Sequence, residues 1–194
     1  MKRLAVLVIA LWVTLCGKVW AVEANPMARL HGGNIVQSIS VAANENNGYF
    51  KTPIENAKIK ALESAVISIE MEPSKKIITK SGKDVTPLTT SHIALSKDTG
   101  KVKEIVFLVQ WNKNAASAMD AFLAAGFVTK LMGKLINPEV KEDGLHKLYK
   151  ALLGDNPGDF LDGKERVARV NGVKCAAQLV PNVGLGLLMS NGTE

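Results

Sequence analysis

The segment 114–136 constrains the fold of this chain more than any other part of the sequence. Apolar residues recur around most of its helical circumference, and its longest uncharged run is the nine residues 121–129. Asn112 or Asn114 can cap its start, and Asn137-Pro138 ends it. A membrane span needs about 20 apolar residues, so this helix is too interrupted by charge to cross a bilayer. We therefore predict a long helix that is covered by a β-sheet.

The apolar band of this helix also supplies most of a candidate binding surface. Such a band suits a core helix, a wall of an apolar ligand cavity, or a surface that faces a partner. Two glycines leave one face of the predicted strand 183–189 thin, which permits close approach of a helix or a ligand. The candidate surface for an apolar ligand or a partner consists of Met119, Phe122, Leu123, Phe127, Leu131, Gly184 and Gly186.

Alternation of apolar and polar residues predicts a series of strands. The segment 101–111 becomes apolar on both faces, so we expect it to be a central strand. The turn 97–100 closes a hairpin before it, and Asn171-Gly172 is the strongest short hairpin signal in the chain. Strands are expected at 34–43, 66–72, 76–80, 91–96, 101–111, 166–170, 173–180 and 183–189.

Two further helices are predicted, over 53–65 and 141–153. Pro53 fits the first turn of the earlier helix, with Thr52 as a candidate N-cap. The later helix carries one apolar stripe, which consists of Leu145, Leu148, Tyr149 and Leu152. Strands and helices come in blocks, which favours an α+β fold. We expect an antiparallel, curved β-sheet packed against one or two helices, with a C-terminal β-meander.

The first 21 residues predict a secretory signal peptide. Two basic residues precede the 13-residue uncharged stretch 4–16, which is shorter than a membrane-spanning helix. Cleavage after Ala21 and cleavage after Ala24 both fit the pattern of small residues. The sequence therefore predicts export, followed by a single α+β domain over 22–194, with no transmembrane span once the leader is removed.

The number of cysteines indicates the cellular compartment in which the protein works. With the leader removed, Cys175 is the only cysteine, so an intramolecular disulfide is excluded and the core alone must stabilise the domain. A disulfide-free exported domain of this size is typical of a bacterial periplasmic or secreted protein. Acylation of Cys16 in a lipoprotein is the alternative, although Leu15 departs from the small residue expected before such a cysteine. The apolar neighbours of Cys175 predict a buried, inert thiol.

Charge and motifs exclude several classes of function. Removing the leader leaves 21 basic residues against 18 acidic ones, a formal net charge of +3. No basic run is interleaved with aromatic residues, so nucleic acid is not an expected partner. His31, His92 and His146 lack a short-range metal-ligand spacing. There is no nucleophile-elbow motif or complete dinucleotide loop, and we expect no catalytic residue, metal or cofactor.

Two functional hypotheses remain, with a third behind them. The first is an exported, non-catalytic binding protein of the cell envelope, such as an assembly factor, an inhibitor or an immunity-type module. Its expected partner is another envelope protein. The second is a carrier of a lipid or other apolar small molecule in a cavity between the sheet and the helix 114–136. The third is a hydrolase without a visible motif.

Overall fold

A seven-stranded antiparallel sheet forms the centre of the protein, with the strand order β1-β2-β3-β4-β7-β6-β5. The computed structural model describes residues 25–45, 48–52, 54, 57–61, 65–110, 115–155, 162–180 and 183–191. The expected α+β class, the curved antiparallel sheet and the C-terminal meander are confirmed, and the sheet stays open. The predicted leader 1–21, its cleavage sites and Cys16 lie outside the described residues.

The sheet consists of two meanders that meet in its middle. Strands β1 to β4 follow one another along the chain, as do β5 to β7, and β4 pairs with β7. The predicted central position of β4 is thereby confirmed. Asn171 (φ 48°) and Gly172 (φ 77°) form the predicted hairpin turn, in which both residues take positive φ. The strands are β1 Ala57–Ala61, β2 Ala65–Met71, β3 Leu88–Leu95, β4 Val102–Gln110, β5 Arg166–Val170, β6 Val173–Val180 and β7 Gly184–Asn191.

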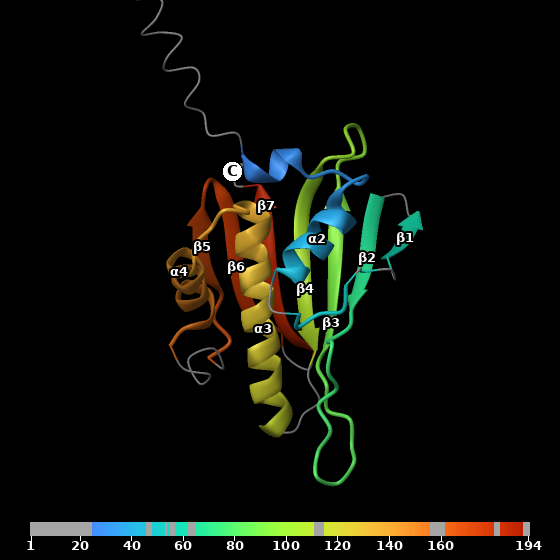
Figure 1. Ribbon diagram of the computed structural model, residues 1–194. Helices are drawn as coiled ribbons and strands as arrows, with labels where there is room; N and C mark the ends of the chain where they lie inside the picture. The colour runs from blue at the N-terminus through green and yellow to red at the C-terminus, as the bar shows by residue number, and fades with distance from the viewer. Residues whose placement is uncertain are drawn as a thin grey trace, which may run out of the picture.

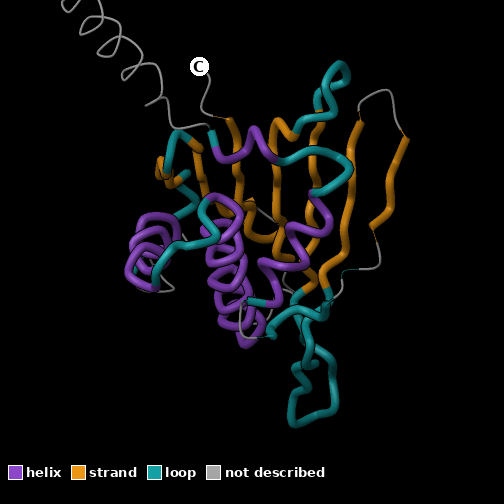
Figure 2. The backbone as a smooth tube through the Cα atoms, turned by 45° about the horizontal axis from the view of Figure 1, so that its top comes forward, coloured by secondary structure: helices purple, strands orange, loops and turns teal. Residues whose placement is uncertain are grey.

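The described helices all lie on one face of this sheet (Figures 1 and 2). They are a short 3-10 helix η1 Pro26–Arg29, and the α-helices α2 Ile35–Asn44, α3 Ala115–Ile136 and α4 Glu142–Leu153. Helix α3 contacts β4 and β7, α4 contacts β5 and β6, and α2 packs on α3. The predictions of α3 and α4 are confirmed. Across the described ranges, none of the helices is both long and apolar enough to cross a membrane.

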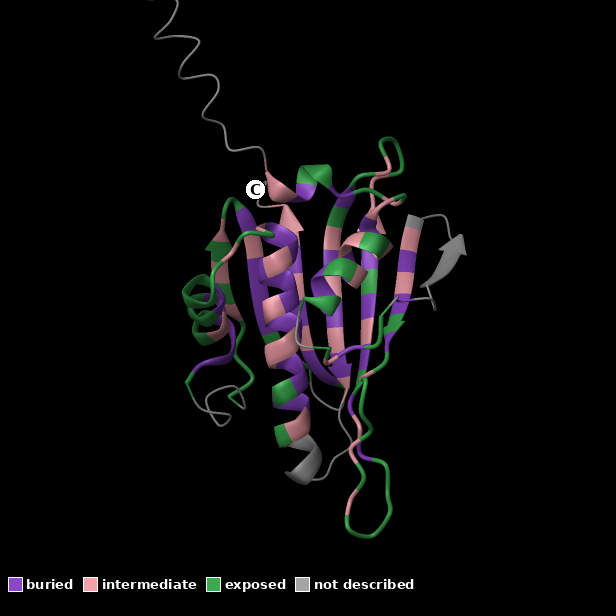
Figure 3. Cartoon of the chain, viewed as in Figure 1, coloured by how far each residue is buried: buried purple, intermediate pink, exposed green. Residues whose placement is uncertain are grey.

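The core lies between α3 and the covered face of the sheet (Figure 3). Phe107 of β4 and Leu187 of β7 are fully buried, as are Val128 and Leu131 of α3. Full burial of a side chain of this size stabilises the folded state by about 1.5–3 kcal/mol, so this layer supplies much of the stability. Cys175 is a free thiol buried in the same core, as predicted.

The predicted strand 34–43 is wrong, because this segment forms α2. Ile35 and Ile39 are fully buried one helical turn apart, whereas 53% of Val41 is exposed. The strand prediction depended on placing Val41 on the same face as both isoleucines. The helix places it outside instead and buries Ala42 and Ala43, whose small side chains carried little weight in the alternation.

The predicted helix 53–65 is also wrong where the structure describes it. Residues 57–61 form the edge strand β1, in which Ile59 pairs with Ile67 of β2. The sequence of β1 alternates with period two, which suits a strand, and backbone hydrogen bonds to β2 override the approximate helical spacing. Residues 53, 55, 56 and 62–64 lie outside the described part of the chain.

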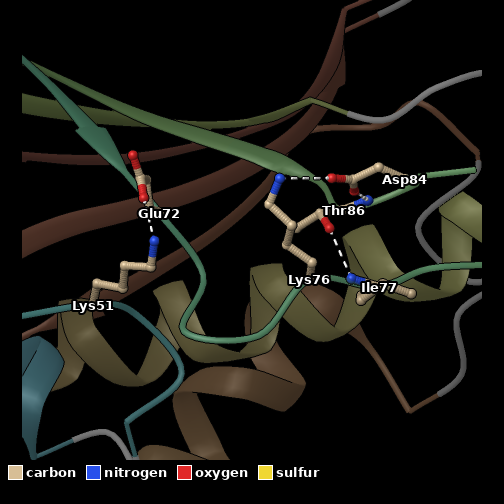
Figure 4. A network of polar contacts seen from close by, with 6 residues as sticks. All are labelled: Lys51, Glu72, Lys76, Ile77, Asp84 and Thr86. Atoms are coloured by element: carbon tan, nitrogen blue, oxygen red, sulfur yellow. Dashed lines mark hydrogen bonds and ion pairs between the residues drawn. The ribbon is translucent and has the colours of Figure 1, made fainter.

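The predicted strand 76–80 is not formed. This segment belongs to the long connection between β2 and β3, which extends beyond the end of the sheet (Figure 1). Ile78 makes only an isolated bridge with Asp84. The two arms of the loop are also joined by the Ile77 backbone N–H, which donates to Thr86 Oγ1 at 2.8 Å (Figure 4). One bridge and a few side-chain bonds are too little for a regular strand pair.

Exposed ion pairs flank this loop (Figure 4). Lys51 Nζ lies 2.6 Å from Glu72 Oε2, and Lys76 Nζ lies 3.3 Å from Asp84 Oδ2. The hydrogen bond from Lys51 lowers the pKa of Glu72, and hydrogen bonds from Thr86 are the main cause of a lowered pKa at Asp84. All four charged side chains are largely exposed, so these pairs orient the loop and add little stability.

Candidate functional site

Close packing of α4 against α3 creates a groove on the surface of the helical layer. A Cβ atom added at Gly133 of α3 would lie 2.5 Å from Leu145 Cδ2 of α4. One added at Gly126, two turns earlier, would lie 3.1 Å from Tyr149 Cε2. A larger residue at either position would press on these two side chains of α4, so the glycines permit the close approach of the two helices.

The groove has a volume of about 170 Å³ and is mainly apolar. Its aromatic walls come from both helices, since Phe122 of α3 meets Tyr149 of α4 edge to face, with ring centroids 6.0 Å apart. The α3–α4 groove is lined by Phe122, Leu123, Gly126, Phe127, Lys130 and Tyr149.

Two exposed apolar side chains extend this groove along α3. Leu123 at its rim is 53% exposed, and Met119, one helical turn before it, is 51% exposed. Behind the groove, the ring of Phe127 stacks on Tyr49, with centroids 4.1 Å apart and planes inclined by 13°. Tyr49 in turn meets the buried ring of Phe50 edge to face. The groove therefore has a firm aromatic base and an exposed aliphatic rim.

Lys130 provides the only charge in the lining of the α3–α4 groove. Its Nζ lies 3.8 Å from Glu142 Oε2, and the side chains are 35% and 82% exposed. Solvent screens so exposed a pair, and an acidic group on a ligand can compete for the ammonium. Partial burial raises the pKa of Tyr149, so its hydroxyl stays neutral at physiological pH.

The hydroxyl of Tyr49 is unusual within this aromatic cluster. Its oxygen is buried and has no hydrogen-bond partner within the described structure. Burial is the main cause of a raised pKa at Tyr49, and the negative charge of Asp120 adds to it. The ring is well packed but the hydroxyl has no hydrogen-bond partner among the described residues, so a substitution that removes only the hydroxyl tests the packing of this cluster.

A second, more polar cleft of about 250 Å³ lies between η1, α2 and the end of α3. Its charged groups are already engaged. Arg29 Nη2 donates to the carbonyl oxygen of Leu135 at 2.7 Å, which satisfies a free carbonyl in the last turn of α3. Lys134 Nζ donates to the carbonyl of Pro138 at 3.1 Å and lies 3.6 Å from Glu45. These contacts tie the ends of three elements together, which is a structural role.

The structure brings together four of the seven residues of the candidate surface. Met119, Phe122, Leu123 and Phe127 all lie in or beside the α3–α4 groove. Leu131 lies apart from them, fully buried in the core.

The two glycines of the candidate surface lie on β7, away from the groove. A Cβ added at Gly184 would overlap the carbonyl oxygen of Val109, so the close neighbour there is the backbone of β4. Gly186 alternates with the core residues Leu185 and Leu187, which places it on the sheet face opposite the helices.

Sequence reasoning missed the two tyrosines of this site. Tyr149 belonged to the apolar stripe of the predicted helix 141–153, which indicated burial against the core but not a groove wall. Tyr49 lies between the predicted strand 34–43 and the predicted helix 53–65 and belonged to neither. The adjacent aromatic pair Tyr49-Phe50 was the available signal, because aromatic residues prefer to pack on one another.

The histidine, cysteine and carboxylate side chains outside the groove bear on metal binding and catalysis. Within the ranges that the structure describes, no three His, Cys, Asp or Glu side chains gather as metal ligands would. His92 contacts two hydroxyls, Ser68 Oγ at 3.1 Å and Thr90 Oγ1 at 3.5 Å, and among the described residues it has no hydrogen bond to a carboxylate of the kind that orients a catalytic histidine. Burial raises the pKa of the Cys175 thiol to about 12, so the thiol is protonated and unreactive at neutral pH.

Comparison of the chain with models of protein families, with curated proteins and with solved structures found no significant match. The chemistry of the α3–α4 groove is therefore what bears on function.

Proposed function

We propose that this chain is an exported, non-catalytic binding protein of the cell envelope. Its α3–α4 groove receives an apolar side chain from another envelope protein. The observation that carries the proposal is the shallow aromatic groove, with Met119 and Leu123 about half exposed beside it. Isolated exposed apolar residues are ordinary, but an apolar groove continued by two such residues is typical of an interaction site.

The composition of the groove suits a protein partner. Aromatic residues such as Phe122, Phe127 and Tyr149 supply large contact areas with few rotatable bonds, and buried aromatic anchors often dominate binding energy. Lys130 at the rim favours a partner that carries an acidic residue next to its apolar anchor. An apolar centre with a polar rim is the usual anatomy of a protein interface.

The carrier hypothesis receives less support. Pockets for small molecules usually measure about 300–1,000 Å³, whereas the clefts described above measure about 250 and 170 Å³. The space between α3 and the sheet is filled by buried side chains such as Phe107 and Leu131. Gly184, which suggested a cavity wall, faces the backbone of β4. We keep the carrier as the alternative and the hydrolase third.

Site-specific photo-crosslinking in the producing cells tests the binding role. A benzophenone amino acid replaces Leu123 in one variant and Ile78 in the control, because both native side chains are 53% exposed but Ile78 lies on the loop between β2 and β3. We expect position 123 to form one discrete protein adduct that position 78 does not form. The purified partner should then bind Leu123→Asp about tenfold more weakly than the original protein, a loss of ~1.4 kcal/mol.

Three results would count against the proposal. These are equal adducts at both positions, no protein adduct at position 123, and a partner whose affinity is unchanged by Leu123→Asp. An adduct of lipid-like mass at position 123 would instead favour the carrier. Because Leu123 is exposed, Leu123→Asp should fold normally, and the thermal unfolding midpoint checks this.

A further inference from the structure

The long connection between β2 and β3, residues 72–87, is here called the β2–β3 finger because it projects beyond the end of the sheet (Figure 1). Hydrogen bonds join its two arms. At its tip, the Thr79 backbone N–H donates to the carbonyl oxygen of Lys83 at 2.9 Å. Nearer its base, the Val85 N–H donates to the carbonyl oxygen of Ile77, also at 2.9 Å. The finger therefore presents its side chains from a defined backbone.

Both carboxylates of the finger are paired with lysines (Figure 4). Glu72, at the base, pairs with Lys51, and Asp84 pairs with Lys76 on the opposite arm. These two pairs leave neither negative charge of the finger uncompensated.

Three further lysines give the finger an excess of positive charge. Lys75, Lys80 and Lys83 are exposed, and within the described residues none of them has an ion-pair partner. With the two paired lysines they make five lysines against two carboxylates, a formal balance of +3. Helix α3 begins at the same end of the molecule (Figure 1), and its Asp120 reduces that balance to +2. The region around the finger therefore remains basic.

An apolar side chain lies beside the tip of the finger. Ile78 directly precedes the turn that starts at Thr79, and it is 53% exposed. A single exposed apolar residue is ordinary on a protein surface. Ile78 differs by its place, near the end of a projecting finger and among lysines that lack partners. Basic residues around an exposed aliphatic side chain are typical of a segment that enters the headgroup layer of a bilayer.

We propose that the β2–β3 finger docks this protein on an anionic lipid bilayer. Lys80 and Lys83 contact headgroup phosphates, and Ile78 reaches the boundary with the acyl chains. Lysine suits this role because its ammonium is a point charge on a flexible stem, which follows lipids as they move. Each lysine near an anionic surface raises the affinity about fivefold, so three lysines and one isoleucine give weak, reversible docking.

A protein partner fits the finger less well. Protein interfaces have an apolar centre surrounded by a polar rim, whereas the finger has one exposed aliphatic side chain and lysines spread over both arms. Neither of the two clefts described above is lined by a residue of the finger. The docking site is therefore separate from the α3–α4 groove, and membrane docking goes beyond the proposed binding of an envelope protein.

Co-sedimentation with lipid vesicles tests the proposal on the full chain as its host processes it. Vesicles with about one third phosphatidylglycerol in phosphatidylcholine supply the anionic surface, and pure phosphatidylcholine supplies the neutral one. At about 0.1 M salt we expect the anionic vesicles to bind the protein at least about tenfold more tightly than the neutral ones. The difference should disappear at about 1 M salt, where the Debye length falls to about 3 Å.

Paired variants separate the finger from the overall charge of the protein. Lys80→Glu with Lys83→Glu should weaken binding to the anionic vesicles at least about twentyfold. The control is Lys97→Glu with Lys101→Glu, which makes the same change of charge in exposed residues of the β3–β4 turn, at the opposite end of the sheet (Figure 1). That end lies about 25 Å away, more than two Debye lengths at about 0.1 M salt, so the control should stay within about threefold of the original protein.

A second pair of variants tests the apolar contact. Ile78→Asp should weaken binding about tenfold, because the isoleucine no longer leaves water on docking. Val41→Asp, on α2, is the matched control, since both native side chains are 53% exposed, and it should bind as the original protein does. All the substituted side chains are exposed, so the variants should fold, and circular dichroism checks this.

Several results would overturn the proposal. These are equal binding to both kinds of vesicle, equal losses in the two pairs of lysine variants, and Ile78→Asp binding as tightly as Val41→Asp. In the producing cells, a benzophenone at position 78 should form an adduct of lipid mass. A protein adduct there would overturn membrane docking and make an acidic protein the occupant of the finger.

Discussion

At the scale of single residues, Tyr49 combines good packing with an unmatched polar atom. Its ring stacks on Phe127, while its buried oxygen has no partner among the residues described. A buried, unsatisfied polar group destabilises the folded state by about 1–3 kcal/mol. We expect Tyr49→Phe to keep the stacking and to raise the free energy of unfolding at pH 7 by about 1 kcal/mol. Urea denaturation measures this, and a clear loss of stability would show that the hydroxyl is bonded.

The same substitution has a second effect at alkaline pH. The pKa of Tyr49 is raised in the folded state, first by burial and then by Asp120, so folding favours the neutral phenol. Its contribution to stability is therefore complete below the unfolded pKa of 10.0 and is lost as pH rises through the folded pKa. Tyr149 acts in the same direction, so only part of the alkaline loss should disappear in Tyr49→Phe. Unfolding at pH 9 and at about pH 11 compares the two proteins.

Substitution by alanine should have a large effect at one glycine of β7 and a small effect at the other. Gly184 has φ 151°, and an added Cβ would overlap the carbonyl of Val109. Gly184→Ala should lower the free energy of unfolding by about 2–4 kcal/mol, through backbone strain and the forced separation of β4 and β7. At Gly186 the nearest atoms to an added Cβ are 3.7 Å away, so Gly186→Ala should change it by less than about 0.5 kcal/mol. Equal effects in thermal or urea unfolding would contradict this account of β7.

At the scale of elements, α2 offers a direct test of helix against strand. In the helix Ile39 is fully buried and Val41 is 53% exposed, whereas in a strand both would share the buried face. We expect Ile39→Ala to cost about 2–4 kcal/mol of stability and Val41→Ala to cost less than about 0.5 kcal/mol. Similar losses for the two variants, measured by urea denaturation, would favour the strand.

The contrast between α2 and α3 shows what local sequence decides. Helix α3 was predictable almost to the residue, because its 22 residues repeat the apolar spacing many times and Pro138 ends it. Helix α2 has ten residues, and Gln37, Ser38 and Ser40 fit a strand as well as a helix. The segment that forms strand β1 was predicted as a helix for a related reason. Its hydrogen bonds to β2 decide its structure, and the short-range spacing of its apolar residues does not reveal them.

At the scale of the whole molecule, the candidate site depends on contacts that sequence patterns do not encode. Four of its predicted residues lie on one helix, so their proximity followed from the helical repeat. Tyr49 and Tyr149 reach the same aromatic cluster from segments 100 residues apart, through packing alone. The pairing of β4 with β7, and hence the separation of Gly184 from α3, also depends on the sheet order. The fold class, the C-terminal meander and the central position of β4 were predictable, whereas the pairing of β4 with β7 was not.

The sheet order also bears on how the chain folds. The first meander ends at β4, and its hydrogen-bonding partner β7 (Gly184–Asn191) follows only after α3, α4, β5 and β6. Until β7 is available, β4 presents an open, apolar edge in what becomes the middle of the sheet. Such long-range pairing has a high entropic cost of loop closure, which slows folding. A nascent chain therefore carries an aggregation-prone edge from the completion of β4 until β7 has been made, and only then can the two meanders join into one sheet.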